Sequence, residues 1–224
     1  IYYITGNGPD NTGANNDLSE PVFITSTVGC SNKRSIAMIP NGLVFQSNKD
    51  IWLLGRDLST KYIGAPVEDF NSYEVQSAVA VPGTNQVRFS LSNGTTLMYD
   101  YFFDQWGTFS VSAVSSTIFE DLHTFINSRG EVYQESTDSY LDGTRPVLMG
   151  LKTGPINLGG VQGFQRAYSF YLIGEYKSPH KLSIGISYDY AQTPEQVSII
   201  QPIENYNYTY GGPDDANYYG SGNY

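Results

Sequence analysis

The chain has 224 residues, a single cysteine, and 22 acidic against 12 basic side chains, which gives a formal net charge of −10. This charge argues against a protein that grips nucleic acid or anionic lipid electrostatically, and one cysteine cannot form the internal disulfides of a small secreted scaffold. No run of about 18 apolar residues occurs, and no charged segment precedes an apolar one at the start. Neither a membrane span nor a signal peptide is therefore predicted.

The N-terminal stretch combines a short apolar run with a long polar loop. Ile1–Ile4 is typical of a strand, and residues 5–17 are rich in Gly, Asn and Asp. Oxygens in residues 6–17 are compatible with a calcium ion, but their spacing misses the EF-hand pattern, so we interpret the segment as a surface loop. Cys30 lies in a Val-Gly-Cys-Ser stretch and is interpreted as a small buried residue rather than a nucleophile.

Three stretches that follow share one layout of short apolar alternations separated by polar turns. In the clearest copy, Ser77–Ser110, the turn at Ser92-Asn93-Gly94 stands between two runs of period two, which is a strong hairpin signal. Related turns begin at Ser47 and Ser128, so the three turns are spaced 45 and 36 residues apart. Such spacing is typical of β-propeller blades, whose repeats run about 40 to 50 residues.

The sequence therefore predicts an all-β fold with propeller-like four-stranded blades at about residues 35–70, 75–112 and 113–136. Three blades cannot close a ring, because natural propellers have about four to eight. The chain also lacks an initiator Met, so we expect a partial ring whose missing blades lie upstream in a longer chain. Trp106 is expected to be buried between blades. The side chains expected in the blade cores are Phe45, Trp52, Phe89, Tyr99 and Trp106.

We assign the blades to residues 1–147. After them the repeated pattern of short alternations and turns ends. Within residues 148–205, two alternating runs at 167–174 and 181–190 predict a long hairpin, either a closing blade or a separate sheet. Residues 206–224 hold many Tyr, Gly and Asn but almost no aliphatic side chains, which suits a contact arm or plain disorder. The candidate interface residues in this arm are Tyr206, Tyr208, Tyr210, Tyr218 and Tyr219.

The search for catalytic chemistry is mostly negative, and no cofactor or metal is predicted. Only two histidines occur, His123 and His180, and no motif of a hydrolase, zinc enzyme or nucleotide-binding loop is present. Asp100 and Asp104 could be the paired carboxylates of a glycosidase, although Asp at such places usually stabilises turns. A carbohydrate-binding propeller is a second alternative, with Trp52 and Trp106 as exposed stacking platforms.

A series of short, spaced motifs runs through most of the chain. They are residues 7–13 (NGPDNTG), 28–31 (VGCS), 39–47 (IPNGLVFQS), 51–56 (IWLLGR), 62–67 (YIGAPV), 99–101 (YDY), 105–106 (QW) and 159–166 (GGVQGFQR). Over residues 5–190 they resemble the tail hub or nozzle propeller proteins of tailed bacteriophages, especially short-tailed ones. The expected upstream blades of that family are missing here, which leaves the ring-contact surface open.

This resemblance implies a non-enzymatic structural protein located in the virion, in the phage tail. It implies further copies of the same chain arranged in a ring, commonly sixfold, with other tail or portal-proximal proteins as neighbours. Genomic DNA would pass through the ring without specific binding, and the resemblance implies no membrane partner and no catalytic residues. An acidic lumen fits this role, because it would repel phosphate and let DNA slide.

Overall fold

The computed structural model describes residues 1–25, 27–136, 141–143, 145–156, 168–173 and 181–200. The chain divides into two compact units, residues 1–146 and 147–224, and each is considered by itself. Strands in antiparallel sheets make up nearly all the regular structure, which confirms the predicted all-β class. The helical elements of the described residues are three short 3₁₀ turns: η1 (Lys33–Ser35), η2 (Ala65–Phe70) and η3 (Pro82–Thr84).

The first two predicted blades are four-stranded sheets, as expected from their turns. The first sheet consists of β3 (Ala37–Ile39), β4 (Gly42–Ser47), β5 (Asp50–Gly55) and β6 (Thr60–Tyr62). The second consists of β7 (Val75–Val81), β8 (Gln86–Leu91), β9 (Thr96–Asp100) and β10 (Gln105–Phe109). In both, each strand pairs with the next one along the chain.

Turn chemistry sets the register of both sheets. Asp50 and Gly94 have φ angles of 73° and 86° at the two central hairpins, where a left-handed backbone conformation closes the turn. Gly42 begins β4 with φ near 149°, and a Cβ there would lie 2.0 Å from the carbonyl oxygen of Leu54. Glycine at position 42 is thus required by the close approach of β4 and β5.

The third predicted blade has three strands in the part of the chain that the structure describes, and not four. They are β11 (Ser115–Phe119), β12 (Leu122–Ile126) and β13 (Val132–Gln134). Glu135 turns toward the second sheet to pair with Arg88, and the next strand, β14 (Leu141–Asp142), pairs with β15 (Arg145–Pro146) in a ladder of its own. The backbone N–H of Glu135 still donates to the carbonyl oxygen of His123 on β12 at 2.9 Å, so the described pairing of the third sheet extends to Glu135.

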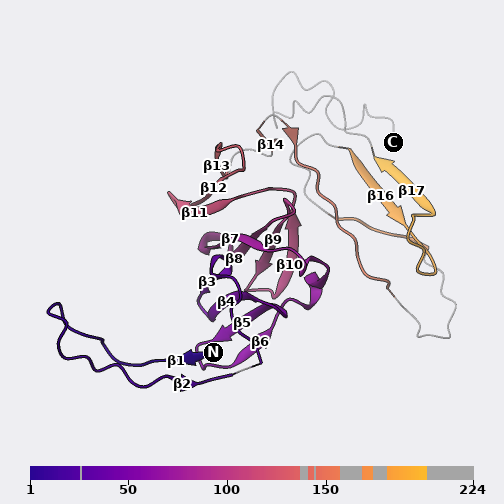
Figure 1. Cartoon of the computed structure of the whole chain (residues 1–224). Coiled ribbons are helices and arrows are strands. Elements are labelled where there is room, and N and C mark those ends of the chain that lie inside the picture. The colour runs from indigo at the N-terminus through magenta and orange to yellow at the C-terminus, as the bar shows by residue number, and fades with distance from the viewer. Residues whose placement is uncertain (26, 137–140, 144, 157–167, 174–180, 201–224) are drawn as a thin grey trace, which may run out of the picture. The chain divides into compact units, whose positions relative to one another are not determined.

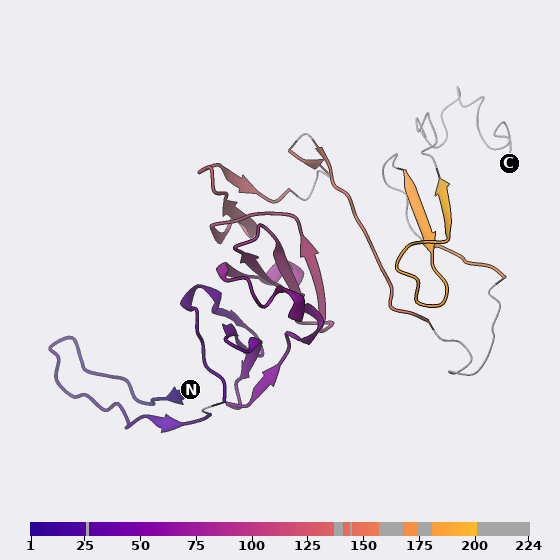
Figure 2. The ribbon, with the colours of Figure 1, turned by 45° about the vertical axis from the view of Figure 1, so that its right-hand side comes forward.

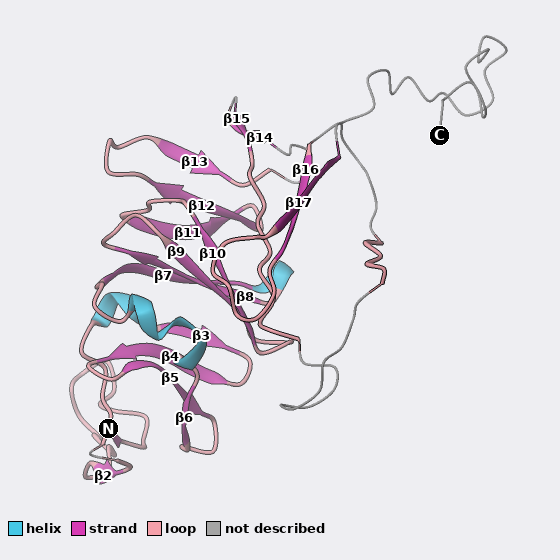
Figure 3. Ribbon diagram, turned by 90° about the vertical axis from the view of Figure 1, so that its right-hand side faces the viewer, coloured by secondary structure: helices cyan, strands magenta, loops and turns pink. Residues whose placement is uncertain are grey.

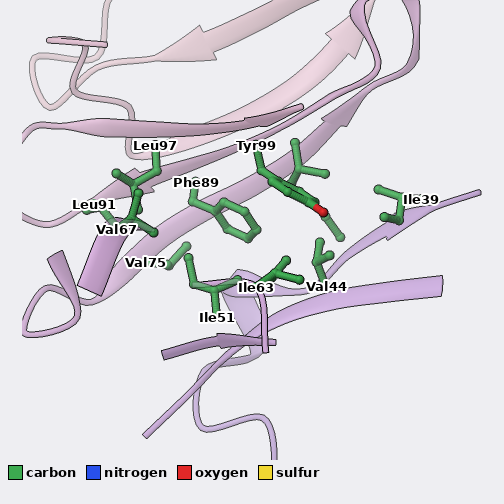
Figure 4. Packing of buried hydrophobic residues seen from close by; sticks show 12 residues of the cluster. Ile39, Val44, Ile51, Ile63, Val67, Val75, Phe89, Leu91, Leu97 and Tyr99 are labelled. Carbon is green, nitrogen blue, oxygen red and sulfur yellow. The ribbon is translucent and has the colours of Figure 1, made fainter. Parts of the chain in front are cut away.

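The three sheets stack face to face in chain order (Figure 3). One apolar cluster fills the space between the first two. Figure 4 shows Phe89 and Tyr99 of the second sheet pointing toward Val44 of the first sheet and toward Ile63, which follows its last strand. The first strand of the second sheet, β7, lies beside the first strands of both neighbours, β3 and β11. This arrangement is consistent with adjacent propeller blades, although the described residues contain no closed ring. The cluster comprises Ala37, Ile39, Val44, Ile51, Ile63, Val67, Val75, Val87, Phe89, Leu91, Leu97 and Tyr99.

A buried amide also joins the first two sheets. The side chain of Gln46 accepts a hydrogen bond from the backbone N–H of Val75 at 3.0 Å and donates one to the carbonyl oxygen of Tyr73 at 2.8 Å. A buried amide whose donor and acceptor are both satisfied fixes one geometry, because any shift leaves a polar group unpaired. Gln46 thus sets the position of β7 against β4.

The N-terminal segment forms a separate two-stranded ladder. Strand β1 (Tyr2–Tyr3) pairs with β2 (Val22–Phe23), and the residues between them run out and back beside one another (Figures 1 and 2). Thr5 and Ser19 hold the two sides together through backbone and side-chain hydrogen bonds. The two sides of this segment are therefore held together by hydrogen bonds within the segment itself.

In the second unit the predicted hairpin is wrong in its pairing. Residues 168–173 carry no strand, and β16 (Leu182–Ile186) pairs with β17 (Gln196–Ile200) instead. The local turn explains the choice: Asp189 and Tyr190 adopt positive φ, and the Pro194 ring packs over Gly185. Pro194 thus lies in the connection that joins β16 to β17. Residues 167 and 174 of the first predicted run and the predicted link at 175–180 lie outside the described residues.

Candidate functional site

The polar loop near the N-terminus uses its own donors to satisfy its carboxylates. Asp10 accepts hydrogen bonds from the backbone N–H groups of Thr12 and Ala14 and from the Thr12 hydroxyl and the Asn15 amide. The Thr12 hydrogen bonds are the main cause that lowers the pKa of Asp10 to about 2. With both oxygens of Asp10 engaged in this way, the geometry fits a self-stabilised turn, as the sequence interpretation preferred.

Asp100 and Asp104 stabilise the turn between β9 and β10. Asp100 accepts the backbone N–H groups of Phe102 and Phe103 at 2.9 and 3.0 Å. Asp104 accepts the Lys61 ammonium at 2.9 Å and the Tyr99 hydroxyl at 2.8 Å, and these hydrogen bonds lower the pKa of its carboxyl group. A glycosidase acid needs a raised pKa, so the environment of Asp104 does not fit the role of the acid in such a pair.

Two of the five expected core side chains lie in the apolar cluster. Phe89 and Tyr99 are buried there, at 0% and 3% exposure. Phe45 is also buried, but it alternates with Val44 and therefore lies on the opposite face of the first sheet. Trp52 pairs with Phe45 and shares this opposite face, where it is half-buried against the Tyr62 ring, so its placement in the core was wrong.

Trp106 lies between the first two sheets but is only half-buried. Its ring packs against Tyr99 with centroids 4.8 Å apart, and its indole N–H donates to the carbonyl oxygen of Ile63 at 2.9 Å. It belongs to the last strand of its sheet, at the rim of the cluster, which is why solvent reaches part of the ring. The expected position is thus found, while the expected full burial is not.

We expect Trp106→Phe to lower the free energy of unfolding by about 1 kcal/mol, because the Ile63 carbonyl loses its donor. Trp52→Phe is the matched control: its indole N–H donates to the carbonyl oxygen of Lys49 on an exposed turn, where water replaces it. The control should cost less than about 0.5 kcal/mol. Urea unfolding followed by circular dichroism measures both, and equal losses would contradict a bridging role for Trp106.

Cys30 is exposed, which corrects the expectation of a buried residue. Its thiol donates to the carbonyl oxygen of Asn32 at 3.1 Å. It borders an apolar hollow of about 130 Å³ on the face of the first sheet that carries Phe45. The short strand alternations that identified the sheets contain no information on which segment covers this face, so the error was one of long-range packing. The other lining residues are Ile1, Ile36, Leu43, Phe45 and Leu54.

A cluster of ionisable side chains lies between the second and third sheets, where Arg88 contacts both His123 and Glu135. Arg88 of β8 donates to Glu135 at 2.8 Å and to Gln86 at 3.1 Å, and its guanidinium stands over the Phe109 ring. The same guanidinium lies 3.0 Å from Nδ1 of His123, on β12. Since arginine can only donate, Nδ1 accepts and the ring proton sits on Nε2.

This cluster does not have the geometry of a proton-transfer site. Burial is the main cause that lowers the pKa of His123 to about 4, and the charge of Arg88 adds to it, so the imidazole is neutral at pH 7. Its Nε2 and the Nε of Arg88 are buried without a hydrogen-bond partner among the described residues. The arrangement joins two sheets through a charge-assisted network, and sequence reasoning missed it because Arg88 occupies a position that alternation marks as solvent-facing.

Several expected sites lie outside the described residues, including His180 and the five candidate interface tyrosines at positions 206, 208, 210, 218 and 219. Over the described ranges, no cluster of three His, Cys, Asp or Glu side chains has the geometry to hold a metal ion. Among the same residues, no helix is both long and apolar enough to span a membrane. The sequence matches no known protein family in a scan of family models, and a search of curated proteins gives no match either.

Proposed function

We propose that this chain is a non-enzymatic structural component of a phage virion tail, part of a hub, nozzle or connector ring that forms the DNA conduit. The observation that carries the proposal is the face-to-face stack of sheets with one apolar cluster between the first two (Figure 4). Such a stack tolerates force, because moving one sheet exposes apolar area on both partners. The motif series that resembles tail hub and nozzle proteins supports a role for these stacked sheets in the virion.

The electrostatics support a conduit more than a DNA-gripping protein. A net charge of −10 repels the phosphate backbone at long range, and close to the surface it lowers the local concentration of DNA. Copies of the chain arranged in a ring would present this charge to passing DNA. The partners under this proposal are further copies and neighbouring tail or portal-proximal proteins.

The glycan-processing and glycan-binding alternatives receive less support from the geometry. The oxygens of Asp100 and Asp104 accept hydrogen bonds from their own turn and from Lys61, and both tryptophan rings pack against neighbouring aromatic side chains. A stacking platform for sugar needs an open aromatic face. We therefore rank the structural role first.

Immunogold electron microscopy of the tailed phage that encodes this chain tests the proposal directly. Antibodies raised against residues 1–146 should label purified virions at the tail, near the junction with the head. Preincubation of the antibodies with the purified chain is the control and should remove the label. Protein that appears in the infected-cell lysate but never on purified particles would contradict the virion role.

A further inference from the structure

The stack of three sheets has two end faces, one on the first sheet and one on the third. We define the outer face of the first sheet by Ile36, Met38 and Leu43, whose side chains point away from the cluster that β3 and β4 share with the second sheet. They are 45%, 73% and 38% exposed. Ile36 and Leu43 also line the hollow that Ile1 and Cys30 border, so the chain itself covers part of this face. The apolar side chains that stay exposed there are unusual for a surface that meets only water.

The third sheet has a comparable outer face, which we define by Phe119, Leu122, Ile126 and Val132. Register places Phe119 opposite Leu122 and Val132 opposite Ile126, so all four side chains point the same way. The alternate residues of β12, His123 and Phe125, point toward the second sheet. Phe119 and Val132 are 58% and 68% exposed.

The two outer faces belong to segments of opposite charge. Residues 28–62, which carry the first sheet, hold five basic side chains against two acidic ones. Residues 113–136, which carry the third sheet, hold four acidic side chains against one basic one. Lys61 is paired with Asp104 and Glu135 with Arg88, which leaves four basic against two acidic side chains in the first segment and three acidic against one basic in the other. Opposite net charges on the two segments favour their encounter and disfavour the pairing of either segment with itself.

The contacts within the stack indicate how these faces would be used. We call the face of a sheet that is directed toward the next sheet along the chain its forward face, and the opposite face its back face. The forward face of the first sheet meets the back face of the second, and the forward face of the second meets the back face of the third. The outer face of the third sheet is a forward face and the outer face of the first sheet is a back face. A second stack placed head to tail would therefore continue the same arrangement.

We propose that the outer face of the third sheet of one copy docks against the outer face of the first sheet of a second copy. The contact is heterologous, so repeated copies form either a closed ring or an open chain. It rests on the charge difference and on continuity with the two junctions inside the stack. It does not depend on the virion role, since a chain outside any virion could associate in the same way.

Sedimentation velocity of the full chain over a wide concentration range tests this contact. The chain should form dimers and larger species, and raising the salt to about 0.5 M should weaken them, because exposed charges are then screened. Met38→Asp places an acid against an acidic partner and Val132→Lys a base against a basic one. Each should weaken association by about tenfold or more, which corresponds to about 1.4 kcal/mol.

The control is Leu148→Asp, at a side chain 95% exposed in the second unit, which should leave association unchanged. An equimolar mixture of Met38→Asp and Val132→Lys chains should form heterodimers, because each variant keeps one intact face. Circular dichroism and melting temperatures show that the variants fold. Monomers at all concentrations, association that survives both substitutions, or a mixture that stays monomeric would overturn the proposal. Any of these results would leave the immunogold result for the virion role untouched.

Discussion

Phe89→Ala is expected to lower the free energy of unfolding of the first unit by about 3 to 5 kcal/mol, the cost of truncating a fully buried Phe. Phe89 has no exposed surface and lies between the first and second sheets (Figure 4). The centroid of the Trp106 ring is 6.2 Å from that of the Phe89 ring. Removing the ring leaves a cavity that strands on both sides, fixed by their ladders, cannot close. Because domains are stable by only about 5 to 15 kcal/mol, this variant should be close to unfolding at 37 °C.

Urea unfolding of residues 1–146 measures the loss, with Phe102→Ala as the matched control. Phe102 is 71% exposed on the turn between β9 and β10, so its truncation should cost less than about 0.5 kcal/mol. Similar losses for both variants would mean that the two sheets do not hold each other through Phe89. The stacked-sheet interpretation would then fail for this unit.

The parts of the fold that follow from local chemistry were predictable from the sequence. The central hairpins of the first two sheets need left-handed residues at their turns, and Asp50 and Gly94 supply them. Alternation around Phe89 assigned that side chain to a buried face. These signals span fewer than about ten residues, so no knowledge of distant segments was needed.

The errors arise where a distant segment decides the outcome. Cys30 and Trp52 both lie on the face of the first sheet away from the cluster, and alternation cannot say which of two apolar faces is covered. Arg88 looked solvent-facing in an alternating strand, yet the third sheet covers it and His123 meets it across a sequence separation of 35 residues. The available signal was a basic residue between two apolar neighbours, Val87 and Phe89, in a strand that is buried on both faces.

The pairing of β16 with β17 shows a different failure. Proline is disfavoured in helices and central strands, so Pro194 by itself does not indicate a strand in the residues that follow it. In the structure it lies in the connection, where its ring packs on Gly185 and leaves the following run of Val, Ser and Ile free to form a strand. Its role depends on the small residue opposite, which the local sequence does not reveal.

The stability of the first unit should fall as the pH is lowered from about 6.5 to about 4, because of His123. The folded state keeps this imidazole neutral, with its pKa lowered to about 4, whereas the unfolded chain takes up a proton near pH 6.5. The unfolded state thus binds more protons across this window, so acid favours unfolding. A shift of this size corresponds to about 3 kcal/mol at the low end of the window.

The environment of His123 gives this loss its physical cause. A protonated imidazole would lie beside the Arg88 guanidinium with its Nδ1 3.0 Å away, in a site closed to water, and Glu135 compensates only in part because Arg88 already engages it. The loss that His123 causes should level off below about pH 4, where its imidazole is protonated in both states. Carboxylates such as Asp10 and Asp104 have lowered pKa values, so the stability that they contribute is lost only in more acidic solutions.

His123→Gln isolates this contribution, since glutamine keeps a polar side chain but cannot be protonated. Urea unfolding of both proteins at several pH values between 7 and 4 gives the difference in pH dependence, from which the carboxylates common to both cancel. The variant should lose the slope between pH 6.5 and 4, even where its stability at pH 7 is lower. Parallel curves for the two proteins would mean that His123 is protonated as easily in the folded state as in the unfolded one, and the contact with Arg88 would then not form in solution.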